Sequence, residues 1–276
     1  MEIKLIALDL DDTLLDSGLE ISEENRMAVA SAEDAGIEIV LASGRNYQAM
    51  RRYVELLGLD RQGNFLVCSN GAETHEARGG ALVERLSLSP DLCREIAQAV
   101  ESRGFPWQVY QAGKILASQV NPWALLDQEL SGLLVEQAPP ADILFASGQT
   151  KFVVPGEPER ISVLFAELSV LFAGRAEVVT SKPYFLELLP LGANKGAALS
   201  RLAARLGLGM ESVMAIGDAM NDLGMIRAAG WGCAPANALE EVKRAARIVS
   251  QKTNEEHAVA DLIYSVALSS RPPERR

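Results

Sequence analysis

The sequence predicts an α/β protein, with a doubly wound parallel sheet and an inserted α+β domain. Three observations lead to this prediction. Short apolar segments rich in β-branched residues alternate with longer helical patterns, each of these helical patterns ends at a glycine, and a less regular middle region interrupts the alternation. The chain has 276 residues, which is enough for two modest domains because a single core stops growing near ~250–300 residues.

Four short segments are predicted as strands of the parallel sheet. Each is almost continuously apolar, which is typical of strands that are buried on both faces. In chain order, the predicted strands cover residues 3–8, 37–42, 64–69 and 212–217.

Four helical patterns accompany these strands. They end at Gly36, Gly58, Gly207 and Gly230, where glycine accommodates the left-handed backbone that commonly follows a helix. The repeated order of strand, helix, glycine and strand predicts right-handed crossovers, and therefore helices on the faces of a parallel sheet.

The middle of the chain is predicted as an insert over residues 81–185, between two pieces of one core domain, 1–80 and 186–276. Its elements are predicted as a helix from residue 90 to about 104, a hairpin over 105–120, a strand over 150–154, a helix over 158–174, and strands over 176–181 and 184–190. The aromatic residues Trp107, Tyr110 and Trp123 fall inside the insert, and we expect them to fill its core.

Charge and hydrophobicity exclude several classes of protein. The chain carries 26 Lys and Arg against 37 Asp and Glu, a formal net charge of −11, whereas nucleic-acid binding requires a basic face. The basic C-terminal sequence SSRPPERR reads as a solvated tail. No stretch approaches the ~20 apolar residues of a membrane span, and the N-terminus lacks a signal-peptide pattern. We expect a cytoplasmic protein that binds neither nucleic acid nor membrane, and the sequence leaves monomer and dimer open.

Cysteine and histidine are predicted to have no catalytic role. Cys68, Cys93 and Cys233 lie in apolar surroundings at scattered positions, so we expect buried thiols and neither disulfides nor a zinc site. His75 and His257 lie in polar segments without a neighbouring ligand, so both are expected at the surface.

Polar residues follow each predicted strand directly. Because ligands of open α/β sheets bind beyond the carboxyl ends of the strands, we expect these residues to converge. They are Asp9, Asp11, Asp12 and Thr13 after the first strand, Ser43 and Arg45 after the second, Asn70 after the third, and Asp218, Asn221 and Asp222 after the last; Lys195 begins a helix nearby.

This collection of side chains favours phosphoryl chemistry. Crowded carboxylates repel one another unless a cation lies among them, and oxygen ligands without His or Cys select Mg²⁺. Magnesium beside a lysine and a serine suits a phosphoryl group. An aspartate can attack phosphorus, and a second acid two residues away can exchange protons with the leaving group and water. Asp9 and Asp11 have this spacing.

The same residues resemble the four motifs of the haloacid dehalogenase (HAD) superfamily. The resemblance lies in DLDDTL from Asp9, ASGR around Ser43, NKG around Lys195, and GDAMND from residue 217, in this order. The long insert, SNGA at 69–72 and AGWGCAPANA at 229–238 resemble the Cof-type branch with a C2 cap. The resemblance covers essentially the whole chain. It implies a Rossmann-like core, a mobile cap domain, Mg²⁺ dependence and hydrolysis of phosphorylated metabolites, often sugar phosphates.

The resemblance also implies the role of each motif residue. Asp9 corresponds to the nucleophile and Asp11 to the general acid and base. The implied metal ligands are Asp9, the backbone carbonyl of Asp11, and Asp218, while Asn221 and Asp222 complete or orient the surroundings of the metal.

The remaining motif residues are expected around the substrate. Ser43 and Lys195 are implied to bind the phosphoryl oxygens, and Thr13 is expected to fix the loop after the nucleophile. Arg45 and Asn70 are further candidates near the substrate.

The sequence departs from the family pattern outside the four motifs. His257 and Ala258 stand where related chains usually have Asp-Gly, so the loop there is expected to differ. Gly224 stands where an acidic residue is common, and Cys233–Ala236 replaces a usual Val-Ala-Met-Gly. These differences concern the rim of the site.

Two other functions use similar residues. A phosphomutase of the same superfamily would return the phosphoryl group to a substrate, and a receiver-like signalling protein would keep it as a phosphoacceptor. The DxDxT spacing, the GDxxND motif and the insert favour the hydrolase over a receiver. No GxGxxG follows the first strand, and the sequence before Lys195 is not a P-loop, which disfavours dinucleotide and P-loop nucleotide binding.

Overall fold

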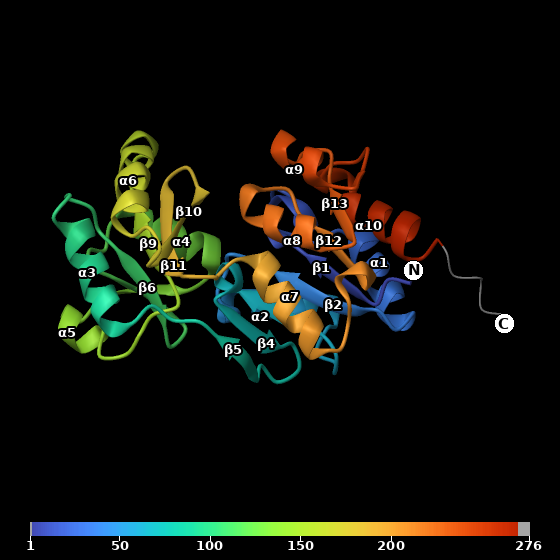
Figure 1. Ribbon diagram of the computed structural model, residues 1–276, viewed down its shortest axis with the longest axis horizontal. Helices are drawn as coiled ribbons and strands as arrows, with labels where there is room; N and C mark the ends of the chain where they lie inside the picture. The colour runs from blue at the N-terminus through green and yellow to red at the C-terminus, as the bar shows by residue number, and fades with distance from the viewer. Residues whose placement is uncertain (1, 270–276) are drawn as a thin grey trace. The chain divides into compact units, whose positions relative to one another are not determined.

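The computed structural model describes residues 2–269, which form two compact units (Figure 1). The first unit comprises the residues up to Ser43, Arg51–Val83 and the residues from Asn194 onward, and the second comprises Gly44–Met50 and Glu84–Ala193. Most of the predicted basic tail SSRPPERR lies outside the described residues. The predicted α/β class is confirmed.

The first unit is built on a sheet of eight strands in the order β14-β13-β12-β1-β2-β3-β4-β5. Its elements, including two that continue into the second unit, are β1 (Leu5–Leu8), α1 (Glu23–Asp34), β2 (Glu38–Ala42), α2 (Tyr47–Leu57), β3 (Phe65–Cys68), β4 (Glu73–Glu76), β5 (Leu82–Arg85), α7 (Lys195–Arg205), β12 (Val213–Ile216), α8 (Leu223–Ala228), β13 (Trp231–Ala234), α9 (Glu240–Ala245), β14 (Ile248–Val249) and α10 (Ala258–Leu262).

Six neighbouring strands of this sheet, from β14 to β3, are parallel. The four predicted strands correspond to β1, β2, β3 and β12, and each is buried along its whole length apart from the first residue of β2. In the centre, Leu8 of β1 is in register with Leu41 of β2 and Ile216 of β12. The carboxyl ends of these three strands therefore lie at one edge of the sheet.

Helices pack on both faces of the sheet because alternate side chains of each strand point in opposite directions. Leu5 and Ala7 of β1 belong to a hydrophobic cluster that also contains Leu199 and Leu202 of α7 and Met225 of α8. The intervening residues of β1 point to the other face, and α1 packs against β2 and α10. Burial on both faces explains the continuous apolar runs that predicted a parallel sheet.

Short strands at the two margins of the sheet were not predicted. β13 and β14 contain only a few residues each, and β13 includes a glycine and a cysteine instead of a β-branched run. β4 is antiparallel to β3 and pairs His75 with Leu66. This pairing buries His75, so the predicted surface position of this histidine is wrong.

The second unit is an α+β layer with a six-stranded sheet in the order β10-β11-β9-β6-β7-β8. All neighbouring pairs are antiparallel except β7 and β8, which are parallel. Its elements are α3 (Pro90–Glu101), β6 (Gln108–Gln111), β7 (Lys114–Ala117), α4 (Pro122–Ser131), β8 (Leu134–Gln137), α5 (Ala141–Leu144), β9 (Phe152–Pro155), α6 (Pro158–Leu171), β10 (Ala176–Lys182) and β11 (Phe185–Pro190).

Helices α3 and α6 contribute apolar side chains to the core of the second unit, which has an aromatic centre. The ring of Trp107 lies 5.2 Å from that of Phe145 and 5.8 Å from that of Phe152 between centroids. The expectation that the insert's aromatic residues fill its core therefore holds for Trp107. Trp123 is only partly buried and stacks on Tyr184 at 5.4 Å.

The second unit extends beyond the predicted insert of residues 81–185. β11 pairs with both β9 and β10, so residues 186–190 belong with the insert's sheet. The short segment Gly44–Met50 also groups with the second unit although it follows β2 directly. Among the described residues, no helix is long and apolar enough to cross a membrane.

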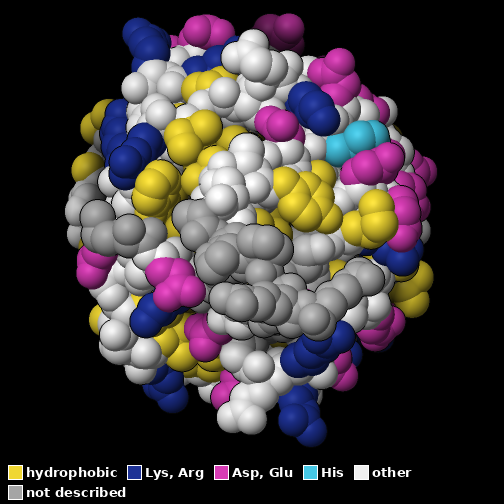
Figure 2. Space-filling model, turned by 90° about the vertical axis from the view of Figure 1, so that its right-hand side faces the viewer, with side chains coloured by type: hydrophobic (Ala, Val, Ile, Leu, Met, Phe, Trp, Pro, Cys, Tyr) yellow, Lys and Arg dark blue, Asp and Glu magenta, His cyan; other side chains and the backbone are white. Residues whose placement is uncertain are grey.

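One face of the molecule is shown in Figure 2. Acidic, basic and hydrophobic side chains are interspersed there, and the side chains coloured in this view form no extended basic area.

Candidate active site

The first and the last motif meet because β1 and β12 are adjacent parallel strands. Asp9 follows β1, and its backbone N–H donates to the carbonyl of Ile216 at 2.9 Å. Asp218 follows the end of β12 by two residues. The predicted convergence of the first and last motifs is therefore produced by the register of two neighbouring strands.

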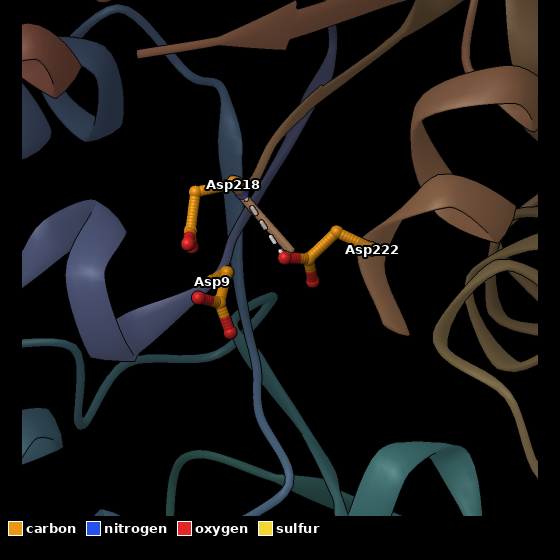
Figure 3. A group of neighbouring side chains, drawn as sticks. All are labelled: Asp9, Asp218 and Asp222. Carbon is orange, nitrogen blue, oxygen red and sulfur yellow. Dashed lines mark hydrogen bonds between the residues drawn. The ribbon is translucent and has the colours of Figure 1, made fainter. Parts of the chain in front are cut away.

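Three carboxylates point toward one another at this edge of the sheet (Figure 3). Carboxylate oxygens of Asp9, Asp218 and Asp222 all lie within 4.8 Å of one another. All three residues are buried, with Asp222 at 0% exposure. Such a group of oxygen donors without His or Cys has the composition that Mg²⁺ prefers.

Asp222 is held in place by the protein itself. Its Oδ2 accepts hydrogen bonds from the backbone N–H groups of Asp218 (3.1 Å) and Ala219 (3.0 Å), and its Oδ1 accepts from Lys195 Nζ (2.6 Å). These bonds occupy both oxygens. The geometry therefore suits Asp222 to orienting the loop after β12 and Lys195.

Asp9 and Asp218 each keep one oxygen without a protein donor. Oδ1 of Asp9 accepts from Lys195 and Oδ1 of Asp218 accepts from Thr13, but within residues 2–269 no hydrogen bond is donated to Oδ2 of either residue. Both residues belong to the candidate metal-binding group of three aspartates. A divalent cation therefore fits this donor set.

Lys195 is a buried cation between two carboxylates. Its Nζ donates to Asp9 Oδ1 at 2.5 Å and to Asp222 Oδ1 at 2.6 Å, and its side chain is fully buried. Burial by itself lowers the pKa of the ammonium, but the charges and hydrogen bonds of Asp222 and Asp9 outweigh it, and the net pKa is raised. Lys195 therefore stays charged, although it begins α7, where the helix dipole disfavours a cation.

The carboxylates hold more negative charge than one lysine can balance. Burial raises the pKa of Asp9 well above its usual value, and the charge of Asp222 raises it further against the opposing effect of Lys195. Burial and Asp222 likewise raise the pKa of Asp218 to about 6, opposed by the hydrogen bond from Thr13. Additional positive charge would favour the ionised form of both residues.

Thr13 contacts the acidic group directly. Its Oγ1 donates to Asp218 Oδ1 at 2.7 Å, and the residue is fully buried. This bond ties the loop after Asp9 to the loop after β12, so Thr13 orients Asp218 besides lying in the loop that it was predicted to fix.

Asp11 lies in the turn after Asp9, outside the three-carboxylate group. Its charge raises the pKa of Asp9, so the two acids interact. Asp12 has a left-handed backbone with φ of 62°, and its carbonyl accepts a hydrogen bond from Asn237 Nδ2 at 2.8 Å. Asn237 was not predicted from the sequence, where its only signal is its position in AGWGCAPANA.

Ser43, Asn70 and Asn221 form a second connected group of motif residues. The backbone N–H of Ser43 donates to Val67, the N–H of Asn70 donates to the Ser43 carbonyl at 3.0 Å, and Asn221 Nδ2 donates to Asn70 Oδ1 at 3.0 Å. Ser43 and Asn70 are both buried. Asn70, which follows β3, is thus hydrogen-bonded both to Ser43 after β2 and to Asn221 after β12.

Arg45 is bound within the second unit. Its Nη1 donates to the carbonyl of Leu130, near the end of α4, at 2.8 Å. The preceding residue, Gly44, also groups with this unit. The motif ASGR is therefore divided, with Ser43 in the first unit and Gly44 and Arg45 in the second.

The departure at His257 and Ala258 is accommodated by the backbone. His257 has a left-handed conformation with φ of 65°, which histidine adopts more readily than most residues. Ala258 begins α10, where a side chain is tolerated. Asn254, in the same loop, donates from Nδ2 to the Leu15 carbonyl at 3.0 Å, so this loop supports the one after Asp9.

The doubly wound sheet, the inserted α+β unit and the acidic group at the strand ends define a class of protein, the α/β phosphohydrolases. The chain belongs to the haloacid dehalogenase-like hydrolase family, whose sequence profile matches residues 6–263. Within the family it is a Cof-type member and a phosphatase.

Individual relatives cover most of the chain. It is 34% identical to the 5-amino-6-(5-phospho-D-ribitylamino)uracil phosphatase YcsE of Bacillus subtilis (strain 168) over 95% of both chains. It is 30% identical to the HMP-PP phosphatase of Klebsiella pneumoniae (strain 342), over 87% of this chain and 86% of the relative.

Among solved structures, a haloacid dehalogenase-like hydrolase from Bacteroides thetaiotaomicron is similar with a TM-score of 0.89 and 31% identity. The similarity covers 96% of this chain and 100% of the other. The fold similarity therefore extends over both units.

Proposed function

We propose that the protein is a Mg²⁺-dependent phosphomonoesterase that hydrolyses a small phosphorylated metabolite through an aspartyl-phosphate on Asp9. The observation that carries the proposal is the group of Asp9, Asp218 and Asp222 around the buried ammonium of Lys195. An aspartate nucleophile, a cation site and a lysine are the parts that phosphoryl transfer to a carboxylate requires.

Asp9 and Asp218 would hold the metal through their carboxylates, together with the Asp11 carbonyl that the family resemblance implies. Their two oxygens without a donor among the described residues support this assignment. Bound Mg²⁺ would offset the repulsion between carboxylates and phosphate and polarise the phosphoryl group.

The chain's own residues account for the remaining steps. A carboxylate oxygen of Asp9 attacks phosphorus and forms an acyl phosphate, while the bond between phosphorus and the leaving oxygen breaks. Asp11 gives its proton to that oxygen and later takes one from the water that hydrolyses the acyl phosphate. Ser43 and Lys195 bind the phosphoryl oxygens. Because Lys195 already contacts Asp9, its charge offsets the repulsion that the attacking carboxylate meets.

The proposed substrate class follows from the relatives and the family resemblance. One relative is named for a phosphorylated ribitylaminouracil and another for HMP-PP, while the resemblance points to sugar phosphates. A small phosphorylated metabolite covers these possibilities, and sugar phosphates are the first class to test.

Phosphate release from p-nitrophenyl phosphate tests the reaction. The wild-type protein should release phosphate with Mg²⁺ and stop when EDTA is added. Asp9→Asn should abolish release, and Asp11→Asn should slow turnover and accumulate a phosphoprotein that mass spectrometry detects. Turnover without metal, or an active Asp9→Asn variant, would contradict the proposal.

A panel of sugar phosphates, nucleotides and phosphorylated cofactors then identifies the substrate. Release of inorganic phosphate supports a hydrolase. An isomeric phosphorylated product would indicate a mutase, and a stable wild-type phosphoprotein without turnover would indicate a phosphoacceptor.

A further inference from the structure

A second buried lysine lies in the second unit. Lys151 immediately precedes β9 and is 5% exposed. Its Nζ donates to Glu187 Oε1 at 3.0 Å and to the carbonyl of Gly44 at 2.9 Å. Glu187 lies on β11, which pairs with β9 and places Glu187 opposite Val153.

The surroundings of Lys151 hold its ammonium in one position. Glu187 is also buried and balances the charge, and the ring of Tyr110 lies 5.0 Å from Nζ. Burying a lysine costs free energy unless it is paired and hydrogen-bonded. Glu187 alone could have balanced the charge of Lys151. The ammonium nevertheless donates a second hydrogen bond to the backbone carbonyl of Gly44.

Gly44 directly follows Ser43, the residue proposed to bind phosphate. The backbone of Ser43 is fixed on the sheet side by two bonds, from its N–H to Val67 and from the N–H of Asn70 to its carbonyl. The next carbonyl along the chain is that of Gly44, and it is fixed by Lys151. Hydrogen bonds therefore restrain the backbone on both sides of the Ser43 side chain.

We infer that Lys151 is a positioning residue for Ser43: by holding the Gly44 carbonyl, it fixes the backbone from which the Ser43 hydroxyl reaches the phosphoryl group. This inference rests on the proposed function, in which Ser43 binds phosphate. Glu187 supports it by holding the ammonium beside the Gly44 carbonyl through a second hydrogen bond. A purely structural Lys151 would instead stabilise the second unit without changing phosphate affinity.

The affinity for inorganic phosphate separates these two roles. It is measured as the inhibition constant against p-nitrophenyl phosphate with Mg²⁺ present. The main variant is Lys151→Met/Glu187→Gln, which removes both buried charges while nearly keeping the side-chain volumes. The matched control is Lys114→Met/Glu136→Gln, which removes an exposed pair of the same type between β7 and β8 in the same unit.

Positioning predicts a specific pattern across the variants. Ser43→Ala and Lys151→Met/Glu187→Gln should each raise the inhibition constant by about tenfold, the loss expected for one hydrogen bond to a charged group. In the Ser43→Ala background, the Lys151 and Glu187 changes should add less than about a factor of two, because residues that act through one contact are not additive. The control should bind phosphate as the wild type does.

Several outcomes would overturn the inference. One is a folded Lys151→Met/Glu187→Gln variant whose inhibition constant for phosphate is unchanged. Another is that the changes at Lys151 and Glu187 raise the constant as much in the Ser43→Ala background as in the wild type. The third is a Ser43→Ala variant that binds phosphate normally. If circular dichroism shows that the double variant does not fold, Lys151→Gln replaces it under the same criteria, because its shorter side chain cannot span to the Gly44 carbonyl.

The wild type distinguishes a failure of this inference from a failure of the proposed function. A wild-type protein that neither hydrolyses p-nitrophenyl phosphate nor binds phosphate removes the proposed function, and this inference with it. An active wild type whose Ser43→Ala variant loses phosphate affinity, while Lys151→Met/Glu187→Gln does not, removes this inference alone.

Discussion

Lys195 donates a hydrogen bond from Nζ to Oδ1 of Asp9 at 2.5 Å, across 186 positions of sequence. The same ammonium contacts Asp222, so one cation lies between the proposed nucleophile and the residue that orients the last motif. The contact requires α7 to begin beside the end of β1. Lys195 therefore contributes to the charge balance of the site, in addition to the phosphate binding that we propose for it.

Lys195→Met should lower kcat/KM for p-nitrophenyl phosphate by about 10²-fold or more, because it removes a preorganised positive charge from the transition state. The melting temperature should fall as well, because Asp222 Oδ1 loses its buried partner, so kcat/KM is measured well below the melting temperature of the variant. Lys243→Met is the control, since Lys243 forms only a surface pair with Glu240 at 3.0 Å. A Lys195→Met variant that keeps full activity but has a lowered melting temperature would instead support a purely structural role for Lys195.

Magnesium should stabilise the folded protein strongly, because the group of Asp9, Asp218 and Asp222 is crowded with like charge. At free Mg²⁺ of 100 times Kd, the free energy of unfolding should rise by about 2.7 kcal/mol. Thermal denaturation at constant ionic strength measures this. Asp218→Asn should remove most of the increase, whereas exposed Asp60→Asn should keep it. An unchanged increase in Asp218→Asn would exclude Asp218 as a ligand.

The three cysteine thiols should be unreactive in the folded protein. Cys68, Cys93 and Cys233 are buried, as the sequence predicted, and burial raises the pKa of Cys93 to about 11 and that of Cys233 to about 12. At pH 8 a thiol-specific chromogenic reagent should modify none of them in the native state and all three in guanidinium. An added surface cysteine, Ser162→Cys, serves as the positive control. Fast native labelling would contradict the buried positions.

The same thiols imply a loss of stability in alkaline solution. Unfolded thiols ionise near ~pH 8.5, whereas the folded state retains their protons to higher pH. The unfolded state therefore binds fewer protons, and the free energy of unfolding should fall as pH rises from about 8.5 toward the raised values. Urea denaturation at several pH values measures this. The free energy of unfolding should fall less steeply with pH in Cys93→Ala than in the wild type.

The sequence was sufficient to predict the sheet and the site where local pattern and strand order determine position. The central strands have buried apolar runs, and parallel order brings their ends to one edge, so the sequence alone predicts that Asp9 and Asp218 lie together. What pairs with Lys195 could not be predicted, because its partners follow from the packing of α7.

Other features depend on contacts that a local pattern does not contain. The grouping of Gly44–Met50 with the second unit depends on side chains from far along the chain, including Lys151. His75 lies in a polar segment yet is buried, because β4 adds to the sheet. Lys151 and Glu187 were not singled out in the sequence, because the pairing of β9 with β11 brings them together.

Gly71 should be required for the start of α7 to lie beside the loop of Asn70. Its φ is +95°, and a Cβ there would lie 2.5 Å from the carbonyl oxygen of Asn194, the residue that caps α7 before Lys195. Gly207 has a similar left-handed φ of +71° but open space around a Cβ. Comparing substitutions at the two glycines therefore distinguishes the cost of a left-handed backbone from the cost of a steric clash.

Gly207→Ala should cost about 1–2 kcal/mol for the left-handed backbone alone. Gly71→Ala should cost about 1–3 kcal/mol more, because the added methyl group must displace the Asn194 carbonyl. It should also lower kcat/KM, since that displacement moves Lys195, whereas Gly207→Ala should leave kcat/KM unchanged. Urea denaturation and p-nitrophenyl phosphate kinetics measure both effects. Equal stability losses in the two variants, or full activity of Gly71→Ala, would mean that the Asn70 loop does not position α7.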